Sequence, residues 1–190
     1  MMRMRLTPPI IKSPTPGGRK PLTRTRRESD ELQQQAQVVK WLRSYGYCLA
    51  AVPNGHVRSK WQNITGAMEG VSAGMPDLLI FDPPPSLPGC VGVALEMKRL
   101  HGGSTDVRDT QRLWLSRLAA RGWVPLVGYG APDAMAQLQV LGFCAESVLD
   151  SSRINHPRRV QRIIRLVERG AKPTEFLFGG AIGEPEEGEE

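Results

Sequence analysis

Three charged residues lie in or beside two apolar segments of this sequence. Glu96 and Lys98 belong to the run Leu95-Glu96-Met97-Lys98, and Asp77 follows Pro76 at the start of another apolar run. Side chains alternate between the two faces of a strand, so Glu96 and Lys98 would share one face. Charges on a buried strand are costly unless they are paired or bind a metal. If the two segments pair as strands, Asp77 and Glu96 converge at one end of the sheet.

Two converging carboxylates would form an oxygen-rich site of the kind that Mg²⁺ or Mn²⁺ prefers. A lysine beside them brings a cation close to a bound water, where it could stabilise developing hydroxide or hold a phosphate. A bound metal lowers the pKa of water and neutralises phosphoryl oxygens. Together these groups predict hydrolysis of a phosphodiester. A Glu-x-Lys triplet alone is common on exposed, salt-bridged strands, so the hypothesis depends on Pro76-Asp77 ahead of it.

Two predicted helices place further polar residues toward the same site. The helix expected at about 106–121 has an inward stripe that includes Gln111 besides Val107, Trp114, Leu115 and Leu118. A glutamine that faces the core needs hydrogen-bond partners, which the site would supply. The helix expected at 31–45 has an apolar stripe that extends back to Glu31 through Val38, Leu42 and Tyr45. Each residue could equally be an ordinary polar residue near a helix end.

The remaining pattern predicts an α/β fold. We expect strands at 47–52, 77–81, 91–98 and 123–128, and a further helix at 132–141. The short, proline-rich connection between 81 and 91 favours an antiparallel pair. The resulting order, αβββαβ, is typical of a mixed sheet with helices on both faces, a three-layer arrangement.

Charge and composition divide the chain into four parts. Residues 1–29 are predicted to be a disordered basic leader, since 1–27 carry eight Lys or Arg and no acid. Residues 30–144 form the predicted globular domain, 145–170 a basic helical extension, and 171–190 a flexible tail that ends in five Glu within 184–190. The leader could attract phosphates or could simply be a solvated tail. The arginines of the helix expected at 157–170 leave the same choice open, between contact with DNA or a partner and a solvated face.

Several classes of protein are disfavoured by the sequence. No apolar run approaches the length of a membrane span and no signal peptide is evident, so we expect a cytoplasmic protein without a membrane partner. Cys48, Cys90 and Cys144 match no zinc or iron–sulfur spacing and are expected to be reduced thiols in or near the core.

Residues 30–143 resemble the VRR-NUC domain, the virus-type replication-repair nuclease branch of the PD-(D/E)XK superfamily. The resemblance is carried by GMPDLLIF, GVALEMKRLHGG and DTQRLWLSRLAARGWVPLVGYGAPDAMAQL, and it extends to ELQQQAQVVKWL and VPNGHVRSK. It differs at Arg108, where family members often have a hydroxyl residue. The resemblance implies a restriction-endonuclease-like core.

The resemblance also implies roles for individual residues. Asp77 and Glu96 would bind Mg²⁺ or Mn²⁺, Lys98 would be the catalytic lysine, and Gln111 and Glu31 would complete the catalytic set. Asn54 and Arg58 fall in an NG…R element, and with Lys98 they would contact DNA.

The function expected from this resemblance is that of a metal-dependent DNA endonuclease in replication, repair or recombination, acting on branched or flap DNA. Stand-alone family members occur in phages and bacteria. Two alternatives remain open from the sequence: a non-catalytic DNA-binding module that keeps the fold, and a sequence-specific restriction-type endonuclease. Symmetric cutting of a junction would favour a homodimer.

Overall fold

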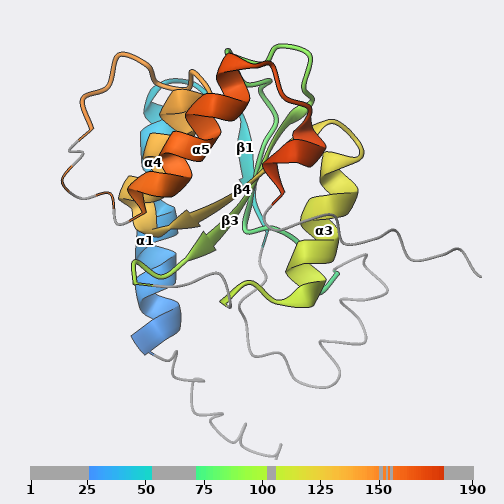
Figure 1. Cartoon of the computed structure of the whole chain (residues 1–190). Coiled ribbons are helices and arrows are strands. Elements are labelled where there is room, and N and C mark those ends of the chain that lie inside the picture. Colours follow the sequence, from blue (N-terminus) through green and yellow to red (C-terminus); the bar gives the residue numbers. More distant parts are fainter. Residues whose placement is uncertain are drawn as a thin grey trace, which may run out of the picture.

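The structure is a computed structural model that describes residues 26–52, 72–101, 106–149, 152, 154 and 156–177. Its elements follow the order α1 (Arg26–Ser44), β1 (Leu49–Ala51), β2 (Leu78–Ile80), β3 (Gly92–Lys98), α3 (Asp109–Ala119), β4 (Trp123–Tyr129), α4 (Gly130–Val140), α5 (Pro157–Glu168) and the short 3₁₀ helix η3 (Pro173–Phe176) (Figure 1). The α/β class and the αβββαβ order predicted from the sequence are confirmed.

The four strands form one mixed sheet in the order β1-β2-β3-β4. β1 pairs with β2 and β2 with β3 in antiparallel fashion, as the short connection between β2 and β3 predicted. β3 and β4 are parallel, because α3 carries the chain back along the sheet between them. The carboxyl ends of β3 and β4 therefore lie at the same end of the sheet as the start of β2.

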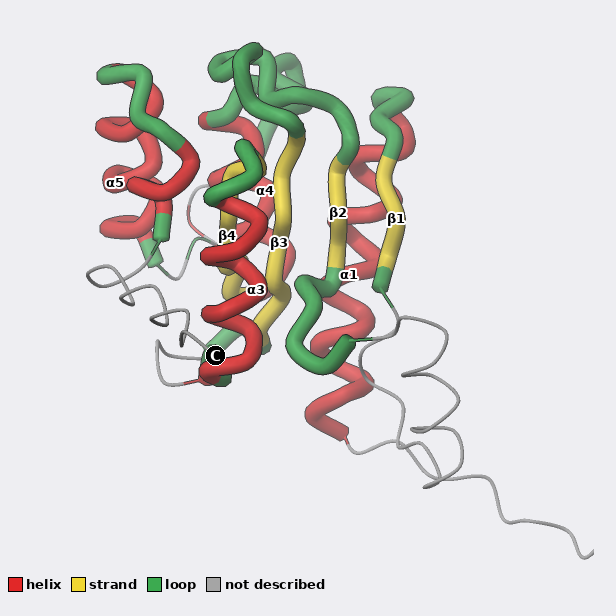
Figure 2. The backbone as a smooth tube through the Cα atoms, turned by 90° about the vertical axis from the view of Figure 1, so that its right-hand side faces the viewer, coloured by secondary structure: helices red, strands yellow, loops and turns green. Residues whose placement is uncertain are grey.

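Helices cover both faces of this sheet, with α3 on one side and α1 and α4 on the other (Figure 2). All seven residues of β3 are buried, which explains why this strand is almost entirely apolar in sequence. Val93, Leu95 and Met97 pack into the main core cluster with residues of α1 and α4. The alternate residue Ala94 packs with α3, so Glu96 and Lys98 face α3 as well.

The inward face of α1 differs in part from the expected one. Val38 and Leu42 are fully buried. Tyr45 was predicted to continue their stripe, but its side chain is 45% exposed. The helix ends at Ser44 and Gly46 follows with a positive φ of 81°, so Tyr45 lies outside the helical periodicity.

The free edge of β4 is covered by its neighbours. Gln137 in α4 donates a hydrogen bond to the Val127 carbonyl, at 3.0 Å, and Asp133 accepts one from the Tyr129 backbone N–H, at 2.9 Å. These side chains form hydrogen bonds with backbone groups of β4 that have no neighbouring strand to pair with. α5 lies beside α4 (Figure 1) and contributes Ile163 to the main core.

The three cysteines differ in their exposure to solvent. Cys144 is buried and Cys90 is partly buried, but Cys48 is exposed, contrary to the prediction that all three lie in or near the core. Within the described part of the chain, no helix combines the length and the hydropathy needed to span a bilayer.

Candidate active site

Asp77 and Glu96 lie across from each other on neighbouring strands. Leu78 pairs with Leu95 at the last position of the antiparallel β2–β3 ladder. Asp77, which precedes Leu78, is therefore opposite Glu96, which follows Leu95. Asp77 Oδ2 accepts a hydrogen bond from the Met97 backbone N–H at 2.8 Å. This bond satisfies a backbone donor beyond the end of the ladder and holds the carboxylate at the end of β3.

The turn before Asp77 packs against the first turn of α3. Gly74 has a φ of +85°, and a Cβ atom added there would lie 2.6 Å from the Thr110 backbone carbon. Only glycine fits both the backbone conformation and this close approach. The contact between Gly74 and Thr110 therefore brings the start of β2 and the N-terminus of α3 together, although the sequence separates them by more than thirty residues.

Glu96 and Lys98 form a buried ion pair on the α3 face of β3. The Lys98 Nζ lies 2.8 Å from Glu96 Oε1, and the two residues are 7% and 1% exposed, respectively. Burial of an unpaired charge would cost several kcal/mol, about 3–5 kcal/mol by analogy with broken buried pairs. The pairing is therefore a condition for placing either residue in this strand.

Gln111 connects this ion pair to α3. Its side-chain oxygen accepts hydrogen bonds from Lys98 Nζ at 3.1 Å and from the Arg108 backbone N–H at 3.0 Å, and its Nε2 donates to Glu96 Oε1. The bond to Arg108 caps the helix, which begins at Asp109 rather than at the expected residue 106. The inward glutamine thus has the partners that its place on the helical stripe requires.

The second carboxylate oxygen of Glu96 differs from the first in its hydrogen bonding. Glu96 Oε2 is buried and has no hydrogen-bond partner among the described residues. Burial, followed by the neighbouring Asp77 carboxyl, raises the pKa of Glu96 to about 8, against the opposing effect of Lys98. Burial also raises the pKa of Asp77. Two carboxylates held this closely out of water favour a cation between them or a shared proton.

The described residues contain no group of three or more His, Cys, Asp or Glu side chains gathered as a metal centre. Mg²⁺, however, keeps several waters and is commonly held by one or two carboxylates together with substrate phosphate. The paired carboxyl groups of Asp77 and Glu96, one with an unpartnered oxygen, fit this type of site. They do not fit a zinc site, which requires more nitrogen or sulfur ligands.

Glu31 lies farther out at the same end of the sheet. It is partly buried in the first part of α1, and its charge contributes to raising the pKa of Asp77. Among the described residues no hydrogen bond joins Glu31 to Asp77 or Glu96, so its place in the catalytic set stays a prediction. Asn54 and Arg58, predicted to contact DNA, lie outside the described residues.

Sequence reasoning missed two residues beside this site. Tyr129 is the register partner of Lys98 on β4 and is fully buried on the same face. The Arg159 guanidinium lies 4.2 Å from the Tyr129 ring centroid and donates a hydrogen bond to its hydroxyl at 3.2 Å. Tyr129 lies one residue beyond the strand expected at 123–128, so a slightly longer strand would have included it. Arg159 could not have been found in this way, because it comes from a helix thirty residues later in the chain.

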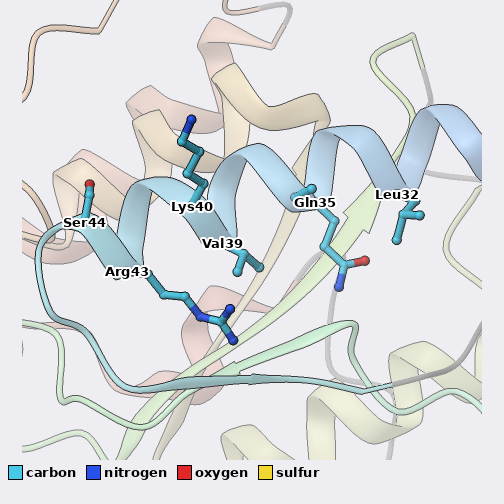
Figure 3. Close-up of a pocket in the computed structure, with 7 residues that line it drawn as sticks. Leu32, Gln35, Val39, Lys40, Arg43 and Ser44 are labelled. Carbon is cyan, nitrogen blue, oxygen red and sulfur yellow. The ribbon is translucent and has the colours of Figure 1, made fainter.

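A surface hollow of about 600 Å³ lies along α1, separate from these residues. It is lined by Leu32, Gln35, Ala36, Val39, Lys40, Arg43 and Ser44. Figure 3 shows Leu32, Gln35, Val39 and Arg43 directed to one side of the helix. None of the predicted site residues lines this hollow.

The mixed sheet with helices on both faces, and the two neighbouring carboxyl groups beside a buried lysine, define an α/β protein with a candidate metal site. The model of the VRR-NUC domain family matches residues 19–130, more than half of the chain and a range that includes all five predicted catalytic residues. This chain belongs to the VRR-NUC domain family.

A solved structure titled "VRR_NUC domain protein" is 21% identical, with 63% of this chain and 92% of the other covered, and a TM-score of 0.46. No protein with curated function matches the sequence.

Proposed function

We propose that this protein is a metal-dependent DNA endonuclease that hydrolyses phosphodiester bonds in branched or flap DNA during replication, repair or recombination. The observation that carries the proposal is the asymmetric environment of Glu96. One carboxylate oxygen is held by Lys98 and Gln111, and the other is buried without a partner opposite Asp77. A buried carboxylate oxygen with no donor from the described residues, next to a second carboxyl group, can accept a cation.

Asp77 and Glu96 are the residues that would hold Mg²⁺ or Mn²⁺. When bound there, such a cation would supply an acidified water and charge neutralisation at the phosphoryl oxygens. Asp77 is oriented for this by the Met97 N–H, which occupies Oδ2, and Glu96 by two donors on Oε1. The two carboxyl groups are therefore fixed before any ligand arrives, which reduces the entropy cost of binding.

Lys98 is the residue placed to handle charge on the substrate. Its ammonium group is restrained by Glu96 and Gln111 and is almost completely excluded from bulk water. A buried ammonium interacts more strongly with a phosphate oxygen or a developing hydroxide than an exposed one does. Gln111 orients this lysine through its side-chain oxygen, and Glu31 adds negative charge at the rim of the site.

Two alternatives make different predictions. A DNA-binding module that has kept the fold would bind DNA and cut none of it. A restriction-type endonuclease would cut one linear duplex sequence at least as well as any branched form, through base contacts in the major groove. The buried, unpartnered oxygen of Glu96 favours catalysis over binding alone, because phosphate binding requires cations rather than a carboxylate pair.

A cleavage panel tests the proposal directly. The purified chain is incubated with end-labelled linear duplex, single strand, flap and four-way junction, with Mg²⁺, Mn²⁺ or EDTA. We expect metal-dependent cutting of the branched forms and its loss in Asp77→Asn and Lys98→Ala. Glu146→Gln, an exposed carboxylate distant in sequence, is the matched control and keeps activity. Cleavage of no DNA form by the folded wild type, or undiminished cleavage by both site variants, would exclude the nuclease.

A further inference from the structure

One side of α5 and its C-cap residue carry a row of arginines. Arg158, Arg162, Arg165 and Arg169 follow each other at intervals of four, three and four residues, so they share one face of the helix. We refer to these four residues as the arginine row. At 1.5 Å per residue the row is about 16 Å long. The only acid within α5 is Glu168.

The four arginines of the row differ in their surroundings. Arg158 and Arg165 are exposed. Arg169 pairs with Glu175 at 2.5 Å, and the half-buried Arg162 donates hydrogen bonds to the backbone carbonyls of Glu175, Phe176 and Leu177. Arg158 and Arg165 are therefore the members of the row whose charge faces solvent.

The arginines of α5 are also close enough to affect one another. Burial, followed by the charges of Arg159, Arg169 and Arg165, lowers the pKa of the Arg162 guanidinium. Like charges crowded in this way destabilise the folded chain unless an anion neutralises them. The row therefore has a physical reason to bind a polyanion.

The arginine row begins at the catalytic end of the sheet. Arg159, next to the first arginine of the row, stacks on Tyr129, and His156 contacts the same ring at 4.7 Å between centroids. Tyr129 pairs in register with Lys98 on the same face of the sheet. α5 then runs from this end along the β4 side of the molecule (Figure 2).

We infer that the arginine row binds the phosphate backbone of a duplex arm of the DNA whose scissile bond lies at Asp77, Glu96 and Lys98. The inference rests on the proposed function, because it takes DNA as the substrate. It goes beyond the family assignment, since α5 begins after residue 130, where the family match ends. At 3.4 Å between successive base pairs, the row would follow about five base pairs of the arm.

Salt-dependent binding tests this surface without requiring cleavage. The full chain is titrated into a fluorescent branched DNA in EDTA, and anisotropy gives the Kd at a series of salt concentrations. Each neutralised phosphate contributes about 0.9 to the slope of log K against log salt. Arg158→Gln/Arg165→Gln is therefore expected to lower the slope by about 1.8 and to weaken binding at least about 10-fold near 0.15 M salt.

Two control variants isolate the role of α5. Lys40→Gln/Arg43→Gln on α1 removes the same charge from exposed positions and is expected to change the slope by less than half as much. Arg158→Lys/Arg165→Lys keeps the charge and is expected to bind like the wild type. Thermal unfolding of each variant shows whether it is folded. If Arg158→Gln/Arg165→Gln does not fold, the salt slope of Arg158→Lys/Arg165→Lys still tests whether charge at these two positions supports binding.

Specific results would overturn the inference. An unchanged salt slope in the glutamine variant, or an equal loss in the α1 control, would show that the arginine row does not contact DNA. Loss of binding in the charge-retaining variant would point to a structural role instead. Because binding is measured in EDTA, a wild type that binds through the row but never cuts would contradict the nuclease and leave this inference intact.

Discussion

Asp77 and Glu96 are brought face to face by the register of β2 and β3, one residue beyond their last ladder pair. Each carboxyl group has one oxygen in a defined hydrogen bond, to the Met97 N–H for Asp77 and to Lys98 and Gln111 for Glu96. The juxtaposition of two buried acids is unfavourable by itself, and the raised pKa of Glu96, about 8, reflects this.

Asp77→Asn should separate the charge of this residue from its structural role. The amide oxygen of asparagine can still accept the Met97 N–H, so the free energy of unfolding should change by less than about 1 kcal/mol. Metal binding by calorimetry should be lost, and cleavage should fall at least about 100-fold, because a bound metal contributes several kcal/mol. Asp77→Ala should lose the hydrogen bond as well and be less stable by about 1–2 kcal/mol. Retained metal binding in Asp77→Asn would contradict the assigned role.

Gln111→Ala should damage both stability and cleavage. It removes an acceptor from Lys98 and from the Arg108 N–H, and a donor from Glu96. Unsatisfied buried groups cost about 1–3 kcal/mol, measurable by urea denaturation. Gln111→Glu keeps the helix cap but places a third carboxylate beside Glu96, so it should recover the cap's contribution and still cut slowly. If the alanine variant cuts at the wild-type rate, Gln111 is not required to position Lys98.

Gly74→Ala should disturb the site from a distance. The methyl group would collide with the Thr110 backbone, and the positive φ adds strain, so we expect a loss of about 1–3 kcal/mol and reduced cleavage. Gly46→Ala is the control for φ alone, because nothing lies within 4 Å of its added Cβ. It should cost about 1 kcal/mol without affecting cleavage. Equal cleavage defects in both variants would argue against a specific contact between Gly74 and α3.

Asp133 should make stability depend on pH. Burial raises its pKa, against opposing effects from the Tyr129 N–H, His156, Arg159 and Gln137. Because the folded pKa exceeds the unfolded one of about 3.9, the stability linked to this group is present below that value and is lost as pH rises through the folded pKa. Wild type should therefore lose stability relative to Asp133→Asn as pH rises above about 3.9, as measured by urea denaturation at each pH. A constant difference would show that Asp133 has an ordinary pKa in the folded chain.

The order of elements could be predicted from sequence because it depends on local periodicity. Alternation in 91–98 predicted a strand with Glu96 and Lys98 on one face, and the 3.6-residue period of 106–121 directed Gln111 inward. Tyr45 was placed wrongly for the same reason, since periodicity does not show where a helix ends. Two predicted boundaries are wrong, because α1 begins at Arg26, inside the expected leader 1–29, and Phe176 of η3 is fully buried inside the expected flexible tail 171–190. The roles of Asn54 and Arg58 stay predictions.

The sequence by itself therefore determined the class of fold, the faces on which Glu96, Lys98 and Gln111 lie, and the candidate carboxylate pair. Only the tertiary structure decided the distances between them, the seating of Gly74 on α3, and the separate environments of the α5 arginines. Residue spacing specifies a face of one helix or strand, because that geometry repeats along the chain. Contacts between elements depend on strand register and helix packing, which arise only when the whole core is assembled.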